Sequence, residues 1–199
     1  MEKMSNVIKG LETVFDHINE KFYNNELIKP IITVQTGRRS VLGWCSANER
    51  WNGKDEKAYE INIVAENLGR TKEQLISTML HECVHLYNCQ KGVSDCNSAQ
   101  YHNKHFKIEA EAHGLNVEKM ANRGFAHTTL NESGKAFAEN EVLEFDLSRI
   151  SASKGKSTYE KPVTYECPGC HRRLRFHNWK LNAICGDCNL KFEPISKPE

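Results

Sequence analysis

Residues 81–85 read His-Glu-Cys-Val-His, and their types and spacing could support hydrolysis at a metal ion. On a helix, His81 and His85 lie one turn apart on the same face, with the carboxylate of Glu82 beside them. Two neutral imidazoles can hold zinc while a coordination position stays open for water, and a carboxylate can take a proton from that water. The motif therefore predicts a zinc peptidase site with His81 and His85 as ligands and Glu82 as general base.

The flanking residues predict the helix that must position this motif. Thr71 and Gln74 are spaced as a capping box at its start. Seven residues then form one apolar stripe at helical spacing: Leu75, Ile76, Met79, Leu80, Cys83, Val84 and Tyr87. His81 and His85 fall outside this stripe, on the polar face with Thr78. Their position favours metal ligands over histidines that are buried in a core.

A catalytic zinc usually has three protein ligands, so a residue downstream must complete the set. The metzincin pattern is excluded, because it requires Gly at the position of Asn88 and His at the position of Lys91. Apolar spacing after residue 103 predicts a second helix, which could face the first. The residues that remain as candidates for the third ligand are His102, His105, Glu109 and Glu111.

Residues 101–106, Tyr-His-Asn-Lys-His-Phe, resemble a segment of the SprT-like zinc metalloproteases, the family that includes the Spartan-related proteins. In that family, HExxH is followed some fifteen to twenty residues later by a Gly-His-Gly-x-x-Phe-like segment. An alignment on Phe106 implies that His102 is the third zinc ligand. Both flanking glycines of the family pattern are absent here.

The resemblance covers about the first 115 residues. A helix that ends near Phe22, with residues 24–27 breaking it before the apolar run 31–34, is similar to the start of SprT-like domains. Strands at about 41–46 and 59–63 supply a small sheet, expected to be antiparallel, behind the metal-binding helix. The expected fold class is therefore α+β.

Two CxxC pairs near the C-terminus form the second metal-binding pattern. Fourteen residues separate Cys167 and Cys170 from Cys185 and Cys188, which is typical of a four-cysteine zinc ribbon with a structural zinc. Cys170 and the following His171 also complete the CxxCH pattern of covalent haem attachment. The second CxxC pair and the lack of a signal peptide argue against haem. SprT-like proteins often carry such a ribbon.

The other cysteines, Cys45, Cys83, Cys89 and Cys96, are expected to be reduced thiols, since disulfide-rich secreted proteins are shorter and carry an export signal. The protein is therefore expected in the cytoplasm or with the nucleoid, and not secreted. An apolar run of 18 residues is absent, so we expect no membrane partner. The expected domains are a SprT-like domain at 1–148, a linker at 149–160 and the ribbon at 161–199.

Charge differs between the two halves of the chain. Residues 1–148 carry 17 basic and 21 acidic side chains, whereas residues 149–199 carry 10 and 5. In the basic part, cations alternate with aromatic rings, a mixture that suits phosphates and unpaired bases. We therefore expect DNA as a partner, with single strands favoured. The candidate contact residues are Arg172, Arg173, Arg175 and Trp179.

Together these patterns predict a zinc endopeptidase with one catalytic and one structural zinc, acting on protein substrates. The resemblance implies that the substrates are bound or crosslinked to DNA, which would place the protein in DNA repair. Two alternatives stay open. One is a non-proteolytic nucleic-acid-binding or transcription-associated zinc protein with the same fold, and the other is a zinc hydrolase of a non-peptide amide. The oligomeric state is not predicted.

Overall fold

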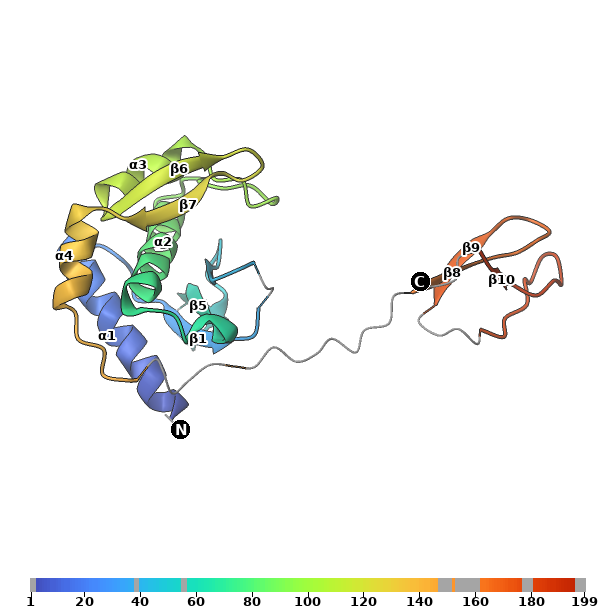
Figure 1. Cartoon of the computed structure of the whole chain (residues 1–199), viewed down its shortest axis with the longest axis horizontal. Helices are drawn as coiled ribbons and strands as arrows, with labels where there is room; N and C mark the ends of the chain where they lie inside the picture. Colours follow the sequence, from blue (N-terminus) through green and yellow to red (C-terminus); the bar gives the residue numbers. More distant parts are fainter. Residues whose placement is uncertain are drawn as a thin grey trace. The chain divides into compact units, whose positions relative to one another are not determined.

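The computed structural model divides the chain into two compact units, 1–154 and 155–199 (Figure 1). It describes residues 3–37, 40–54, 57–146, 152, 162–176 and 181–195. The predicted linker at 149–160 lies outside these ranges except for Ala152. Within the described residues, the search for a helix long and apolar enough to cross a membrane finds none.

The first unit combines helices with short sheets, which confirms the α+β class. Its elements are α1 (Met4–Tyr23), β1 (Ile31–Gln35), β2 (Gly43–Cys45), β3 (Trp51–Asn52), β4 (Lys57–Ala58), β5 (Glu60–Val64), the 3-10 helix η1 (Ala65–Asn67), α2 (Lys72–Gln90), α3 (Lys104–Ala112), β6 (Leu115–Met120), β7 (Gly124–Leu130) and α4 (Glu132–Asn140).

The HExxH motif lies in the middle of α2, and the predicted capping box is present at the start of that helix. The backbone N–H of Gln74 donates to the Thr71 hydroxyl at 3.3 Å, and the Gln74 side chain accepts from the N–H of Thr71 at 3.2 Å. These bonds satisfy two N–H groups that would otherwise be unpaired at the helix start. The cap thereby fixes where α2 begins.

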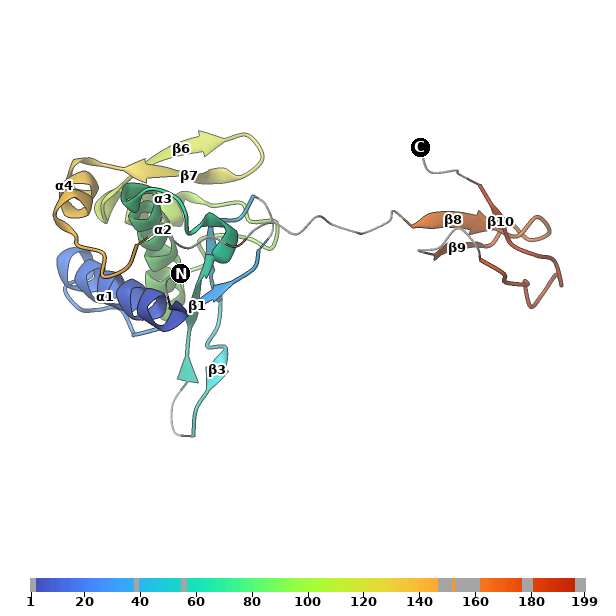
Figure 2. The ribbon, with the colours of Figure 1, turned by 60° about the horizontal axis from the view of Figure 1, so that its bottom comes forward.

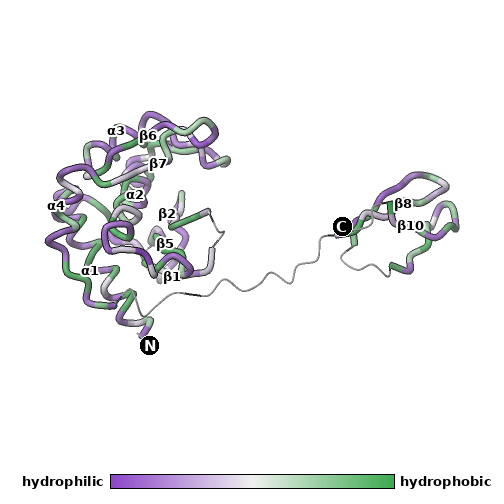
Figure 3. Tube along the Cα trace, in the orientation of Figure 1, coloured by the Kyte–Doolittle hydropathy of each residue, from purple (hydrophilic) through white to green (hydrophobic). Residues whose placement is uncertain are grey.

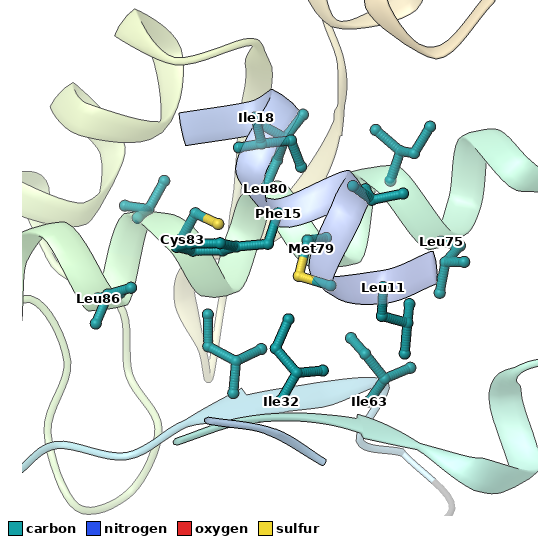
Figure 4. Close-up of a cluster of buried hydrophobic side chains, with 14 of the residues drawn as sticks. Leu11, Phe15, Ile18, Ile32, Ile63, Leu75, Met79, Leu80, Cys83 and Leu86 are labelled. Carbon is teal, nitrogen blue, oxygen red and sulfur yellow. The ribbon is translucent and has the colours of Figure 1, made fainter. Parts of the chain in front are cut away.

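The apolar stripe of α2 is buried between α1 and the sheet. Figure 4 shows this cluster, with side chains from α1 (Leu11, Phe15, Ile18), from the sheet (Ile32, Ile63) and from α2 (Leu75, Met79, Leu80, Cys83, Leu86). Along α1 the tube in Figure 3 changes between hydrophilic and hydrophobic colours, as one buried face requires. Because the stripe is buried, the opposite, polar face of α2 and both of its histidines point away from this core.

The sheet beside α2 has the strand order β1-β5-β2. β2 is antiparallel to β5, as expected, but β1 runs parallel to β5 with Ile31 opposite Glu60. The antiparallel pairing expected for the strands at about 41–46 and 59–63 is therefore confirmed, and β1 adds a parallel strand to this sheet. Along the chain, β2 runs opposite to β1 and β5 runs opposite to β2, so β1 and β5 share one direction. Because β5 lies between β1 and β2 in the sheet, it pairs with β1 in parallel. The hairpin of β3 and β4, which connects β2 to β5 along the chain, projects beyond the sheet (Figure 2).

Residues 115–140 complete the unit as the hairpin β6–β7 followed by α4. β6 and β7 pair antiparallel, with Leu115 opposite Leu130. The helix expected after residue 103 is confirmed as α3. The hairpin contacts both α2 and α3, so it lies against the helix that carries the motif.

The second unit contains a three-stranded antiparallel sheet in the order β10-β8-β9, formed by β8 (Val163–Glu166), β9 (Arg173–Phe176) and β10 (Glu193–Pro194). Its small core consists of Val163, Tyr165, Cys167, Cys185 and Phe192. So little apolar surface seldom stabilises a fold of this size without a disulfide or metal.

Candidate active site

Three histidines converge on one point at the polar face of α2. Nε2 of His102 lies 3.2 Å from Nε2 of His81 and 3.1 Å from Nε2 of His85. Zinc binds imidazole nitrogens at about 2.0–2.1 Å, so tetrahedral ligands would lie about 3.4 Å apart. The observed spacing fits this geometry closely. These three side chains could therefore hold a zinc ion.

The second ring nitrogen of each imidazole has its own polar neighbour. Nδ1 of His85 lies 2.8 Å from Oδ2 of Asp95, and Nδ1 of His102 lies 3.1 Å from the carbonyl oxygen of Gln100. Both partners are acceptors, so these nitrogens carry the hydrogen and leave the Nε2 lone pairs free for a metal. Nδ1 of His81 lies 3.1 Å from Oγ1 of Thr128, which comes from β7.

The surroundings favour the neutral form of two of these imidazoles. Burial and the nearby His85 lower the pKa of His81 well below its usual value and that of His102 to about 4. Burial alone would also lower the pKa of His85, but its hydrogen bond to Asp95 and the nearby Glu82 raise it instead. Neutral imidazole is the form that binds metal.

The contribution of Asp95 to the site could not be predicted from the sequence. Its side chain is buried, and Oδ2 also accepts a hydrogen bond from Nδ2 of Asn88 at 3.0 Å. Asn88 therefore holds the carboxylate that orients His85. No spacing rule links a loop aspartate to a helix ten residues earlier, so only the fold brings them together.

The backbone of His102 is held on two sides. Its N–H donates to the carbonyl of Arg123 at 3.0 Å, and its carbonyl accepts from the N–H of Phe125 at 3.0 Å. Between these two contacts lies Gly124, with φ of +61°. A Cβ at this glycine would come 2.1 Å from the His102 carbonyl oxygen. Glycine is therefore required for the hairpin to approach the third histidine so closely.

His102 lies immediately before the cap of α3, whereas His105 lies within that helix. The side chain of Asn103 caps α3 by accepting from the N–H of His105 at 2.8 Å. Phe106 is fully buried, with its ring centroid 4.5–4.9 Å from those of the three imidazoles. His105 is exposed. The structure thus brings His102, and not His105, to the histidine pair.

The two carboxylate candidates for the third ligand have other neighbours. Glu109 lies 3.6 Å from Nδ1 of His113, and Glu111 pairs with Lys107. Neither belongs to the cluster of possible metal ligands around His85. His127 is exposed on β7 and lines the cleft.

Glu82 lies beside the imidazoles and faces β2. Its side chain is buried, and it accepts a hydrogen bond from the backbone N–H of Cys45. A Cβ at Gly43 would come 3.1 Å from Oε1 of Glu82. Burial raises the pKa of this carboxyl to about 7, although a metal cation nearby would lower it. A carboxyl with such a pKa can accept a proton and return it near neutral pH.

These groups open into one cleft with a volume of about 1480 Å³. It is bounded by β2, by the polar face of α2, by residues 92–96 and by β7. Cys45, Cys89 and Cys96 line it, and burial raises the pKa of each of these thiols. A raised pKa favours the protonated, unreactive thiol.

In the second unit the four cysteines of the CxxC pairs also converge. Their Sγ atoms lie within 4.8 Å of one another, and those of Cys170 and Cys185 are 3.6 Å apart. Tetrahedral zinc with bonds of about 2.3 Å would place its sulfurs about 3.8 Å apart. Backbone N–H groups of residues 188 and 187 lower the pKa of Cys185 to about 7, which favours the thiolate. This group could hold a closed, structural zinc.

The predicted nucleic-acid residues differ in their surroundings. Arg172 pairs with Asp187, and Arg173 lies 2.6 Å from Glu166. Arg175 is exposed on β9 and has no ion-pair partner within the part of the chain that the structure describes. Trp179 lies outside the described residues. Of the three arginines, only Arg175 has no carboxylate partner among the described residues.

A sequence model described as the SprT-like family matches residues 11–130, which is more than half of the chain. The match runs from α1 to the end of β7 and includes all three histidines and Glu82. It does not reach the four-cysteine unit. No curated protein and no solved structure matches the chain significantly.

Proposed function

The chain belongs to the SprT-like family, and from this membership and the site geometry we propose that it is a zinc-dependent endopeptidase. The observation that carries the proposal is the convergence of three Nε2 atoms beside a buried carboxylate. His81, His85 and His102 would bind the zinc, and the position left open would face the cleft.

Glu82 performs the proton transfers in this proposal. When bound, zinc supplies the Lewis acidity that activates the attacking water and polarises the scissile carbonyl. Glu82 takes a proton from the attacking water and then passes it to the nitrogen of the leaving amine. The N–H of Cys45 supports this role because it holds the carboxylate at the edge of the cleft.

The edge of β2 offers a place for an extended substrate. The N–H of Ser46 and the carbonyl of Leu42 bond to β5, so the N–H and carbonyl of Gly43 and the carbonyl of Cys45 face away from the sheet, while the N–H of Cys45 is bonded to Glu82. A peptide could pair with them as an added strand. The cleft also extends to both sides of the histidines, toward residues 70–78 and 92–96. This shape favours an endopeptidase over a hydrolase of small amides.

The ribbon provides the argument for DNA-associated substrates. Residues 149–199 are basic and residues 1–148 acidic, so nucleic acid would bind the second unit and leave the cleft free for protein. The ion pair of Arg172 with Asp187 is largely exposed, and such pairs contribute only about 0–1 kcal/mol, so phosphate could compete for Arg172. The side chain of Arg173 is also exposed, but its partner Glu166 is only 18% exposed. We propose that the ribbon, with its structural zinc, binds single-stranded DNA.

The test is to incubate the purified full chain with a basic DNA-binding protein, with and without single-stranded DNA. We expect cleavage that DNA accelerates, that a zinc chelator abolishes and that added zinc restores. Cleavage that DNA does not accelerate would support the endopeptidase proposal and contradict the proposal that the substrates are associated with DNA. If no protein is cleaved by zinc-loaded enzyme under either condition, the endopeptidase proposal is wrong.

A further inference from the structure

One cation in the cleft, Arg70, has no part in holding the histidines. It directly precedes Thr71, the cap of α2, and it lines the cleft together with Gln74 and Thr78. Its Nε donates to the carbonyl of Asn67 at 2.8 Å, and its Nη1 donates to Oγ1 of Thr78 at 3.0 Å. Nη1 also donates to the carbonyl of Gln74 at 3.4 Å, and these bonds hold the guanidinium against the first turns of α2.

The charge of Arg70 is not compensated. Among the residues that the structure describes, no carboxylate forms an ion pair with it, and its Nη2 is buried without a hydrogen-bond partner. Burial lowers the pKa of its guanidinium. A cation withdrawn from water without a counter-charge is unfavourable, so an anionic group brought into the cleft would be attracted to it. By contrast, the cleft residue Lys135 is largely exposed and lies 3.8 Å from Glu132.

Arg70 lies close to the position that the leaving amine would occupy beside Glu82. In the proposed mechanism this amine receives its proton from Glu82. Thr78, which Arg70 contacts, is one turn before Glu82, a distance of about 6 Å along the helix. β2 passes over both, since a Cβ at Gly43 would meet Cγ2 of Thr78 at 3.0 Å and Oε1 of Glu82 at 3.1 Å.

The same geometry indicates which substrate side chain Arg70 could contact. An extended peptide paired with β2 advances about 3.3 Å per residue. The guanidinium beside Thr78 is therefore within reach of the first or second side chain after the scissile bond. A hydrogen bond from a guanidinium to a carboxylate is charge-assisted and about twice as strong as one to a neutral amide side chain.

We propose that Arg70 is a specificity-determining residue that selects peptides with Asp or Glu at the first or second position after the scissile bond. This inference rests on the proposed endopeptidase function. It assigns Arg70 to substrate recognition in addition to its contacts with Asn67 and Thr78.

The first test compares two peptides that differ only by Glu or Gln at these positions. A hydrogen bond to a charged group is worth about 1.5–3 kcal/mol, so kcat/KM for the Glu peptide should be about 10–100 times higher. Arg70→Gln should bring the ratio of the two kcat/KM values close to 1. Lys135→Gln, which removes a different cation that lines the cleft, should keep the preference.

The second test separates this inference from catalysis. Binding of both peptides to zinc-loaded Glu82→Gln protein is measured, with and without Arg70→Gln in addition. If no peptide is cleaved by the wild-type chain but Glu82→Gln still binds the Glu peptide more tightly through Arg70, the endopeptidase proposal fails and the recognition role stands. Equal affinities for the two peptides would overturn the role of Arg70.

A purely structural role for Arg70 predicts a different pattern. Thermal melting shows whether Arg70→Gln still folds, and Arg70→Lys provides a variant that keeps the charge but loses the contacts that hold the guanidinium at Asn67 and Thr78. The inference requires that Arg70→Lys reduces the Glu preference below the wild-type ratio. A wild-type preference retained in folded Arg70→Lys and Arg70→Gln proteins would refute it.

Discussion

Oδ2 of the buried Asp95 lies 2.8 Å from Nδ1 of His85, on the side of the imidazole opposite to the shared metal-binding point. A carboxylate in this position fixes the ring and makes its other nitrogen a better ligand. The loop after α2 thus contributes to the metal centre through Asp95, which orients the ligand His85 and is not itself one of the three histidine ligands.

Asp95→Asn should weaken zinc binding, because the amide is a poorer acceptor for the N–H of His85. Loss of such a partner typically lowers metal affinity or activity about 10–100-fold. Competition with a chromogenic chelator measures this affinity. Asp16→Asn, at an exposed aspartate that pairs with Lys29, is the control and should bind zinc as the wild type does. Equal zinc affinity in both variants would show that Asp95 does not tune the site.

Gly124→Ala should destabilise the fold and disturb His102, since the added Cβ would meet the His102 carbonyl at 2.1 Å. Gly92→Ala is the matched control, because Gly92 also has positive φ (+68°) but its Cβ would meet nothing within 4 Å. The left-handed conformation costs alanine about 1–2 kcal/mol in either variant. Urea unfolding and zinc titration should show a further loss for Gly124→Ala alone. Similar losses in both would mean that the close contact is unimportant.

His102→Ala and His105→Ala separate the two histidines of residues 101–106. His102→Ala should lower zinc occupancy of the first unit, since it removes one of three ligands. His105 is exposed and outside the histidine cluster, so His105→Ala should leave occupancy near the wild-type value. Elemental analysis, corrected for the zinc of the ribbon, gives the answer. A site emptied by His105→Ala instead would reverse the assignment.

The features that could be predicted from the sequence are those fixed by local spacing. His81, Glu82 and His85 are one turn apart on any helix, the capping box needs only Thr71 and Gln74, and each CxxC pair is a local turn. His102 was found through the family resemblance, because its approach to α2 depends on the loop fold.

Features that depend on long-range packing were not predictable. Thr128 and Gln100 meet the imidazoles only after β7 and the loop before α3 have packed on α2. The parallel pairing of β1 with β5 follows from the insertion of β5 between two strands. The ion pairs of Arg172 and Arg173 likewise depend on how the ribbon folds.

Replacing Arg172, Arg173 and Arg175 together by Gln should weaken binding of single-stranded DNA, because it removes three charges that phosphates can contact. Affinity of the wild type should fall steeply as salt rises, and less steeply for the triple variant. Arg175→Gln alone should produce a large share of the effect, since Arg175 has no competing carboxylate among the described residues. Fluorescence anisotropy with a labelled oligonucleotide measures both. An unchanged affinity of the triple variant would return the ribbon to a structural or protein-binding role.

The most direct test of the proposed mechanism is the Glu82→Gln variant, measured for zinc content and for peptide cleavage in the same preparation. Glutamine keeps the shape of the side chain and removes no ligand, so zinc content should match the wild type. The rate of cleavage should fall by about 10²–10⁴-fold, the usual contribution of a general base. Full zinc occupancy with wild-type cleavage would contradict the assignment of Glu82 as the general base of a zinc endopeptidase.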